Sequence, residues 1–248
     1  NIADWNLVGL PLYVEDNSVS SIFPESIEGT LFSFDVSYVQ EEAMSPGTGY
    51  CLRFDSEGIS SLTGTPINEL SIALSEGWNL ISGISSIVDV NNISDTDEII
   101  IPGTIYGFNG SYIQAETINP GNGYWMRATT DGQILISNTF SRESKARELF
   151  VNRPNGNVLI FNNGLELFFG MEITETNRYN YSLPPKMPEG FDVRFSNNLR
   201  ATEDFGVLEI TSTGHPIKFS YETREIEDEW TLINKESGNV FPISGKGL

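Results

Sequence analysis

Short runs of alternating apolar and polar residues recur along this chain, and none carries the wider period of an ordinary amphipathic helix. A period of two places every second side chain on one face of a strand, so the pattern predicts an all-β protein. Turn residues separate the runs, because the 248 residues include 23 glycines and 12 prolines. Residues 18–23 are expected to form one short helical turn before Pro24.

Two long stretches of this pattern are copies of each other. Residues 29–54 and 103–128 share twelve of 26 positions without a gap, at an offset of 74. A shorter match, residues 5–9 against 78–82, precedes them at an offset of 73, so one residue was gained or lost between the two signatures. Self-similarity of this kind predicts a duplicated structural unit whose two copies share a core.

Each copy is expected to contain about five strands. In the second copy, Asn109-Gly110 is a strong hairpin signal. The turns at residues 46–49 and 120–123 combine a proline with two glycines, and neither leads into a helix or is followed by lysine, so a phosphate-binding loop is not favoured. The predicted strands of the repeat region are residues 5–12, 29–34, 37–40, 50–54, 58–62, 69–74, 124–128 and 132–136.

Charge divides the chain at the end of the second copy. The net charge of the chain is −20. Residues 1–138 contain two basic side chains, neither of them lysine, and eighteen acidic ones, whereas residues 139–248 contain twelve basic and sixteen acidic ones. We therefore predict a two-copy β-repeat domain over residues 1–140, with copies at about 1–74 and 75–138, and a linker at 141–148. The acidic surface serves solubility or attracts cations, and it excludes the basic face that nucleic acid requires.

Residues 149–248 are expected to form a second β domain. Their predicted strands recur about every ten residues with turns between them, which is typical of an immunoglobulin-like or fibronectin-III-like β-sandwich of six to eight strands. A turn at residues 162–164 joins the first two. The predicted strands are residues 158–161, 165–169, 179–183, 191–195, 207–211, 217–221 and 229–233.

Candidate catalytic residues are few. The single histidine, His215, lies in a Thr-Gly-His-Pro turn, and no Gly-x-Ser-x-Gly elbow presents a nucleophile. The single cysteine, Cys51, aligns with Trp125 of the second copy, which favours a small apolar filler in the core over a reactive thiol. One histidine and one cysteine far apart are a poor zinc set. We assign no catalytic, cofactor-binding or metal-binding residue and expect no enzymatic activity.

Two further constellations have a functional and a structural interpretation. Four acidic residues on one loop offer oxygen ligands for calcium, but their spacing is not that of an EF-hand, so a solvated loop is favoured. Five aromatic residues suit a sugar-binding platform, but they recur at equal repeat positions, which favours core packing. The acidic residues are Asp89, Asp95, Asp97 and Glu98, and the aromatic residues are Trp5, Trp78, Trp125, Tyr50 and Tyr124.

The motifs of the chain resemble a known family arrangement. Residues 77–80 (GWNL), 103–108 (GTIYGF) and 119–125 (NPGNGYW) resemble the tandem modules near the C-termini of large secreted proteins of Bacteroidota, Ignavibacteria and related groups. Residues 165–174 and 181–198 resemble the β-sandwich that follows those modules and commonly precedes a type IX secretion sorting domain. The resemblance implies export to the cell surface or beyond, and it supplies no catalytic residues.

These observations lead to one main expectation and its alternatives. The chain starts at Asn1 with no signal-peptide pattern and has no apolar run of membrane length, so we interpret its start as processed and expect no insertion into a membrane. We expect a non-enzymatic extracellular structural module, a stalk, adhesin segment or filament subunit that associates with itself or with other surface proteins. The alternative is a carbohydrate-binding module, and a cation-dependent adhesion module is a third hypothesis.

Overall fold

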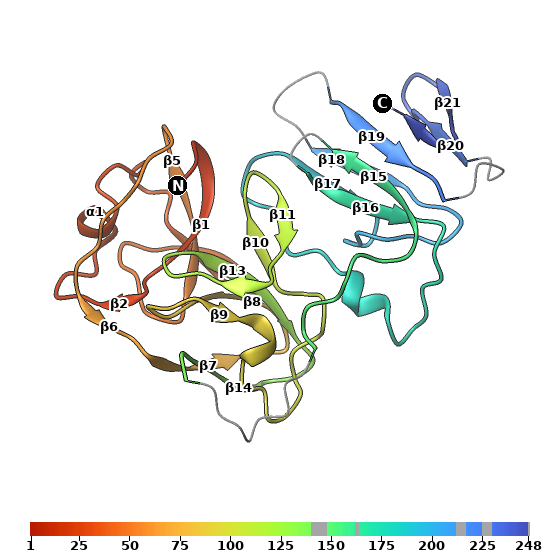
Figure 1. The fold of residues 1–248 in the computed structure, drawn as a ribbon. Coiled ribbons are helices and arrows are strands. Elements are labelled where there is room, and N and C mark those ends of the chain that lie inside the picture. Colours follow the sequence, from red (N-terminus) through yellow and green to blue (C-terminus); the bar gives the residue numbers. More distant parts are fainter. Residues whose placement is uncertain (140–147, 162–163, 212–216, 225–229, 248) are drawn as a thin grey trace. The chain divides into compact units, whose positions relative to one another are not determined.

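In the computed structural model, the regular secondary structure is almost entirely β: 43% of residues lie in strands and 5% in helices. This confirms the predicted all-β class. The structure describes residues 1–139, 148–161, 164–211, 217–224 and 230–247. The chain forms two compact units (Figure 1). The first comprises Asn1–Val151 together with Pro184–Gly190, and the second comprises Asn152–Leu183 together with Phe191–Leu248.

The first unit contains two four-stranded antiparallel sheets with the same strand order. Equivalent residues pair in both: Phe32 lies opposite Cys51 in one sheet, and Tyr106 lies opposite Trp125 in the other. The duplicated sequence therefore folds as a duplicated sheet. In order across each sheet, the strands are β1 (Asp4–Gly9), β5 (Gly49–Phe54), β3 (Phe32–Asp35) and β4 (Ser37–Gln40), and then β8 (Gly77–Ser82), β13 (Gly123–Ala128), β10 (Tyr106–Phe108) and β11 (Tyr112–Gln114).

Side chains shared by the copies hold the same turns. The hydroxyl of Tyr50 accepts a hydrogen bond from the amide of Ser45 at 2.9 Å, and that of Tyr124 accepts one from the amide of Asn119 at 2.9 Å. Both tyrosine rings are buried, so each hydroxyl satisfies a turn amide at the edge of the core. The last tyrosine of each copy therefore has a structural role in the turn before it.

The two copies bind each other through reciprocal backbone hydrogen bonds. The amide of Gly9 donates to the carbonyl of Gly121 at 3.0 Å, and the amide of Ser82 donates to the carbonyl of Gly47 at 3.0 Å. Each copy therefore offers a strand end to the glycine-rich turn of the other. Because the bonds are related by the sequence offsets of the repeat, the copies form one pseudo-symmetric pair.

Glycine is needed where these backbones meet. A Cβ on Gly49 would collide with the carbonyl of Ile81, and a Cβ on Gly123 would lie 2.8 Å from the carbonyl oxygen of Val8. Contacts that short are not tolerated, so the last glycine of each Pro-Gly-x-Gly turn permits the close approach of the copies.

The two copies differ in the strands that accompany their four-stranded sheets. β7 (Glu69–Leu74) pairs with β14 (Gly132–Ser137), which confirms both predicted strands but not a predicted pairing. Because Ile72 and Leu74 lie in the core of the second copy, β7 belongs to that copy, and the predicted boundary between the copies at residue 74 is wrong. The matching strand predicted at residues 58–62 is wrong, because no second strand lies beside those residues in the described part of the chain. The other short elements of the unit are β2 (Leu12–Tyr13) paired with β6 (Thr65–Pro66), β9 (Val88–Asp89) paired with β12 (Thr117–Ile118), helix α1 (Val19–Ile22) and 3-10 helix η1 (Val90–Asn92).

The hydrophobic cores of the two copies differ in size for the same reason. The core of the second copy includes Ile72 and Leu74 of β7 and Ile134 and Ile136 of β14. The core of the first copy is smaller and has no such layer. Its buried members are Val8, Leu10, Ile22, Leu31, Met44, Tyr50, Leu52 and Phe54.

The second unit is of the β-sandwich type, as predicted. Its described residues form one four-stranded sheet and two hairpins of two strands each. The sheet consists of β16 (Glu166–Phe169), β15 (Asn157–Phe161), β19 (Phe219–Glu222) and β22 (Lys246–Gly247), and the hairpins are β17 (Asp192–Phe195) with β18 (Leu208–Thr211) and β20 (Trp230–Ile233) with β21 (Val240–Ile243).

The strand predicted at residues 179–183 is wrong. Arg178–Tyr181 form the 3-10 helix η2. A turn before it sets this path: the side chain of Asn177 accepts from the amide of Thr174 at 2.8 Å, and the amide of Arg178 donates to the carbonyl of Thr174. Local side-chain bonding to the backbone therefore overrides the apolar alternation.

The boundary between the units lies later than the sequence indicates. Most of the predicted linker, at residues 140–147, lies outside the described residues. Leu149 is buried in the core of the second copy, and its amide donates to the side chain of Asn91 at 2.7 Å. Residues 149–151, predicted to open the sandwich, thus belong to the first unit, as does Pro184–Gly190.

Candidate functional site

The aromatic residues of the repeat signature lie in the interior. Trp5, Trp125, Tyr50 and Tyr124 are buried, and only Trp78 is partly exposed. The ring of Trp125, with no exposed surface, packs edge-on against Phe34 at 4.8 Å and against Trp78 at 6.3 Å between ring centroids. Four of the five rings are buried and present no face to a pyranose, and Trp78 alone does not make a platform, so the five residues do not form one.

Equivalent tyrosines of the two copies bind one irregular segment of the first unit. The hydroxyl of Tyr38 donates to the carbonyl of Lys186 at 2.8 Å, and that of Tyr112 donates to the carbonyl of Pro185 at 2.6 Å. The two tyrosines are 74 residues apart and occupy the same position of the repeat. Pseudo-symmetry thus places two donors on consecutive carbonyls of Pro184–Gly190.

Cys51 lies under the same segment. Its side chain has no exposed surface, which confirms the interpretation as a core filler, and its Sγ lies 3.6 Å from the Sδ of Met187. Burial raises the pKa of the Cys51 thiol to about 12, against a smaller lowering effect of a hydrogen bond with Tyr38. The thiol is therefore protonated at neutral pH and inert as a nucleophile.

Two of the four acidic residues considered for calcium, Asp89 and Asp95, accept hydrogen bonds from nearby backbone amides. The carboxylate of Asp89 accepts from the amide of Asn91 at 2.8 Å, and that of Asp95 accepts from the amides of Ile99 and Ile100 at 2.9 Å each. Over the described ranges, no three His, Cys, Asp or Glu side chains gather as a metal site would require. Asp97 and Glu98 are not brought together with the other two as a ligand set.

Two further expectations concern His215 and membrane insertion. His215 lies at residues 212–216, outside the described part of the chain, so the structure gives it no position. Among the helices that the structure describes, none is long and apolar enough to cross a lipid bilayer.

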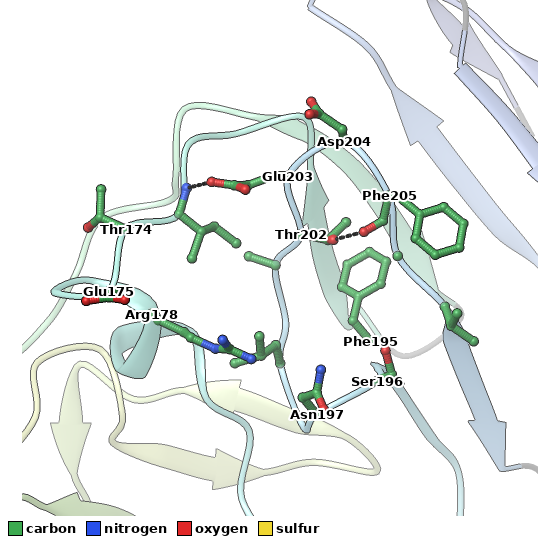
Figure 2. Close-up of a pocket in the computed structure, with 15 residues that line it drawn as sticks. Thr174, Glu175, Arg178, Phe195, Ser196, Asn197, Thr202, Glu203, Asp204 and Phe205 are labelled. Carbon is green, nitrogen blue, oxygen red and sulfur yellow. Dashed lines mark hydrogen bonds between the residues drawn. The ribbon is translucent and has the colours of Figure 1, made fainter.

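The second unit contains an open cavity of about 500 Å³. It is formed by the segment that includes η2, the turn after β17 and the loop before β18 (Figure 2). Figure 2 shows Arg178 and Glu175 on one side and the rings of Phe195 and Phe205 on the other. Its lining residues are Ile173, Thr174, Glu175, Arg178, Phe195, Ser196, Asn197, Leu199, Ala201, Thr202, Glu203, Asp204, Phe205, Gly206 and Val207.

A buried ion pair fixes the turn on one side of this cavity. Arg194 has no exposed surface, and its Nε lies 2.6 Å from Oδ1 of Asp192 on the same strand. Its Nη1 also donates to the side chain of Asn198 at 3.0 Å. Because a buried guanidinium must be paired, this network holds the left-handed turn of Asn197 and Asn198, whose φ angles are 69° and 57°.

The loop before β18 is fixed by its own side chains. Oε1 of Glu203 accepts from the amide of Ile173 at 2.8 Å, and the hydroxyl of Thr202 donates to the carbonyl of Phe205 at 2.5 Å. These bonds leave the ring of Phe205 80% exposed. An exposed aromatic ring in a cavity that amide, carboxylate and guanidinium groups also line suits a polyol, whose C–H face stacks while its hydroxyls form hydrogen bonds.

Sequence reasoning missed this cavity and the tyrosine pair. For the tyrosines a signal existed, since Ser-Tyr recurs at residues 37–38 and 111–112. For the cavity the only signal is an aromatic residue in a short acidic loop, Glu203-Asp204-Phe205-Gly206, which is too weak to select it.

Comparisons with protein-family models, with characterised proteins and with solved structures find no match to this chain. The function therefore has to be argued from the geometry of the two units and from the motif resemblance.

Proposed function

We propose that this chain is a non-enzymatic extracellular structural module that assembles with copies of itself or with other surface proteins through its β domains. The observation that carries the proposal is the use of the shared residues. The glycines of the repeat signature permit contact between the copies, and its tyrosines and tryptophans fill or fasten the core. Because the shared side chains serve packing and contact between the copies, the motif favours a structural role over a catalytic one.

A surface for assembly is offered by the hairpin β20–β21. Ile233 and Val240 lie directly opposite each other on its two strands and are 58% and 61% exposed. Phe241, the next residue of β21, points to the opposite face of the hairpin and is 49% exposed. Exposed apolar cross-strand pairs on a two-stranded hairpin favour burial against a neighbouring domain, because contact removes their surface from water.

The extracellular part of the proposal rests on motif resemblance. Residues 77–80, 103–108 and 119–125 resemble modules of type IX-secreted surface proteins. With a net charge of −20, the expected partners are proteins or glycans rather than nucleic acid.

Association of the purified chain tests the proposal. Light scattering and electron microscopy over a wide concentration range should show oligomers or filaments. Val240→Lys should weaken association by about tenfold or more, because an ammonium group cannot be buried there without a partner. Ile87→Lys, at a 65% exposed position of the first unit, is the matched control and should leave association unchanged. Dispersed monomers at every concentration, or equal effects of both variants, would contradict the assembly role.

Carbohydrate binding in the cavity of the second unit is the second candidate. The exposed ring of Phe205 over a lining of mixed polarity is the observation that favours it. A glycan array should give a saturable ligand whose binding falls about tenfold or more in Phe205→Ala, as expected when a ring stacked on the ligand is removed. Phe241→Ala, an exposed ring outside the cavity, should bind as the parent does. Absence of saturable binding would eliminate this candidate.

A further inference from the structure

One edge of the repeat is complete in the second copy and only begun in the first. β7 and β14 pair over six positions, starting from Leu74 opposite Gly132. The repeat offsets place Asn1 and Gly58 at these two positions. The amide of Gly58 donates to the carbonyl of Asn1 at 3.3 Å, and the amino group of Asn1 donates to the carbonyl of Gly58 at 3.0 Å. The first pair of an equivalent ladder is therefore formed.

The chain leaves this pair along the same path in both copies. The side chain of Asn6 accepts from the amide of Ile2 at 2.8 Å, and the side chain of Asn79 accepts from the amide of Ser75 at 2.9 Å. The residue two positions before each asparagine has a positive φ, 72° at Asp4 and 94° at Gly77. The path from Asn1 to Asn6 thus reproduces the path by which β7 leads into β8.

Among the residues that the structure describes, no strand lies beside residues 59–63, although the hydroxyl of Ser60 is hydrogen-bonded to the side chains of Asn1 and Glu25. Ile59 is 95% exposed, whereas Ser60 and Leu62 are half-buried. In the second copy the residues equivalent to Ser60 and Leu62 are Ile134 and Ile136, which are buried in the core that β7 helps to form. Leu62 packs against the core of the first copy, so its outer surface is what an added strand would cover.

We propose that residues 58–63 are an acceptor edge for a β-strand that leads into Asn1 from its amino side. Continuity with the Asn1–Gly58 pair fixes the occupant as antiparallel and in register with that pair. It resembles β7, with apolar residues second and fourth before Asn1, where β7 carries Ile72 and Leu70. Strand addition of this kind gains main-chain hydrogen bonds and covers apolar surface. The site involves neither the β20–β21 hairpin nor the cavity, so it stands or falls separately from the proposed function.

Extending the full chain tests the site. Residues Glu-Leu-Ser-Ile-Ala, the sequence of residues 69–73, are joined ahead of Asn1, and amide hydrogen exchange is compared with the parent chain. In the antiparallel register the amides of Ser60 and Leu62 gain partners and those of Ile59 and Ser61 do not. Exchange at Ser60 and Leu62 should slow by about a hundredfold, and the Tm should rise.

The matched control carries Glu-Leu-Ser-Pro-Ala instead. Proline in the second position before Asn1 removes the amide that would pair there, so protection of Ser60 and Leu62 should be lost. Unchanged exchange in the first extension, or equal protection in the proline control, overturns the proposal. Protection of the parent chain by the free pentapeptide or by raised protein concentration would also overturn it, because the occupant would then come from another molecule.

Discussion

The two copies of the repeat share their central sheet and differ in what lies over it. In each, a strand with tryptophan at its second position pairs with the strand after the glycine-rich turn, and that strand pairs with a hairpin. Only the second copy adds β7 and β14, and its core is correspondingly larger. The shared signature therefore specifies the sheet and its contact with the other copy, while the covering layer depends on residues that the copies do not share.

A second difference lies inside the sheets. Cys51 and Trp125 occupy the same position and both have no exposed surface. Trp125 fills its site against other rings, whereas Cys51 leaves room that Met187 fills. An equivalent core position thus accepts a small or a large side chain when the neighbouring segments supply the remaining volume.

Trp125→Ala should have the largest effect on stability of the variants considered. Loss of a fully buried indole leaves a large cavity, so the free energy of unfolding should fall by about 3–5 kcal/mol. Cys51→Ala, at the equivalent position, should cost about 1 kcal/mol because little volume is removed. Chemical denaturation of both variants measures the difference. Equal losses would show that the two sites are not packed as described.

Gly49→Ala tests the close approach of the copies. The new methyl group meets the backbone of Ile81, which cannot rotate away, so we expect a loss of about 2–3 kcal/mol. Gly121→Ala is the control: it has a positive φ of 81° but open space around it, and should cost about 1 kcal/mol. If the control were the more damaging variant, backbone conformation and not contact between the copies would explain the glycine.

Tyr38→Phe and Tyr112→Phe test whether equivalent tyrosines of the two copies have the same role. Each removes one hydroxyl that donates to a carbonyl of Pro184–Gly190, so each should cost about 1 kcal/mol. Tyr13→Phe, at a 52% exposed position, should have no measurable effect. Thermal unfolding of the three variants distinguishes a shared role from a one-sided one, in which only one of the two tyrosines would matter.

The ionisation of Cys51 should have no effect on stability at neutral pH and should act only in alkali. Burial raises the pKa of the thiol from its ordinary value of 9.0 to about 12. The folded state therefore keeps its proton when the unfolded state loses it, so this contribution is present below pH 9 and is lost as pH rises towards 12. Alkylation should accordingly be undetectable in the native chain at pH 8 and rapid in denaturant. Rapid native labelling would contradict the burial of Cys51.

The sequence predicts the repeat, the all-β class and most strands, because alternation and turn residues are local signals. It fails at residues 58–62 and 179–183, which depend on a pairing partner and on a side-chain turn. It also places the unit boundary too early, because the burial of Leu149 depends on residues distant in sequence.

The candidate sites are less predictable than the fold. Repeat identity marks Tyr38 and Tyr112 as a pair, but nothing in the sequence reveals that they bind Pro185 and Lys186. The cavity beside Phe205 depends on the buried pairing of Arg194 with Asp192, which looks like an exposed charge pair in the sequence. Sites built from long-range contacts leave little trace in local pattern.

We infer that the two copies, each with its own hydrophobic core, unfold as one cooperative unit because of the hydrogen bonds and close backbone contacts between them. Native-state hydrogen exchange at the amides of Gly9 and Ser82, which make the reciprocal bonds, tests it most directly. We expect both amides to open with the same free energy, equal to that of the central amides of β5 and β13. Opening of one copy at a lower free energy, with the other still protected, would contradict the claim.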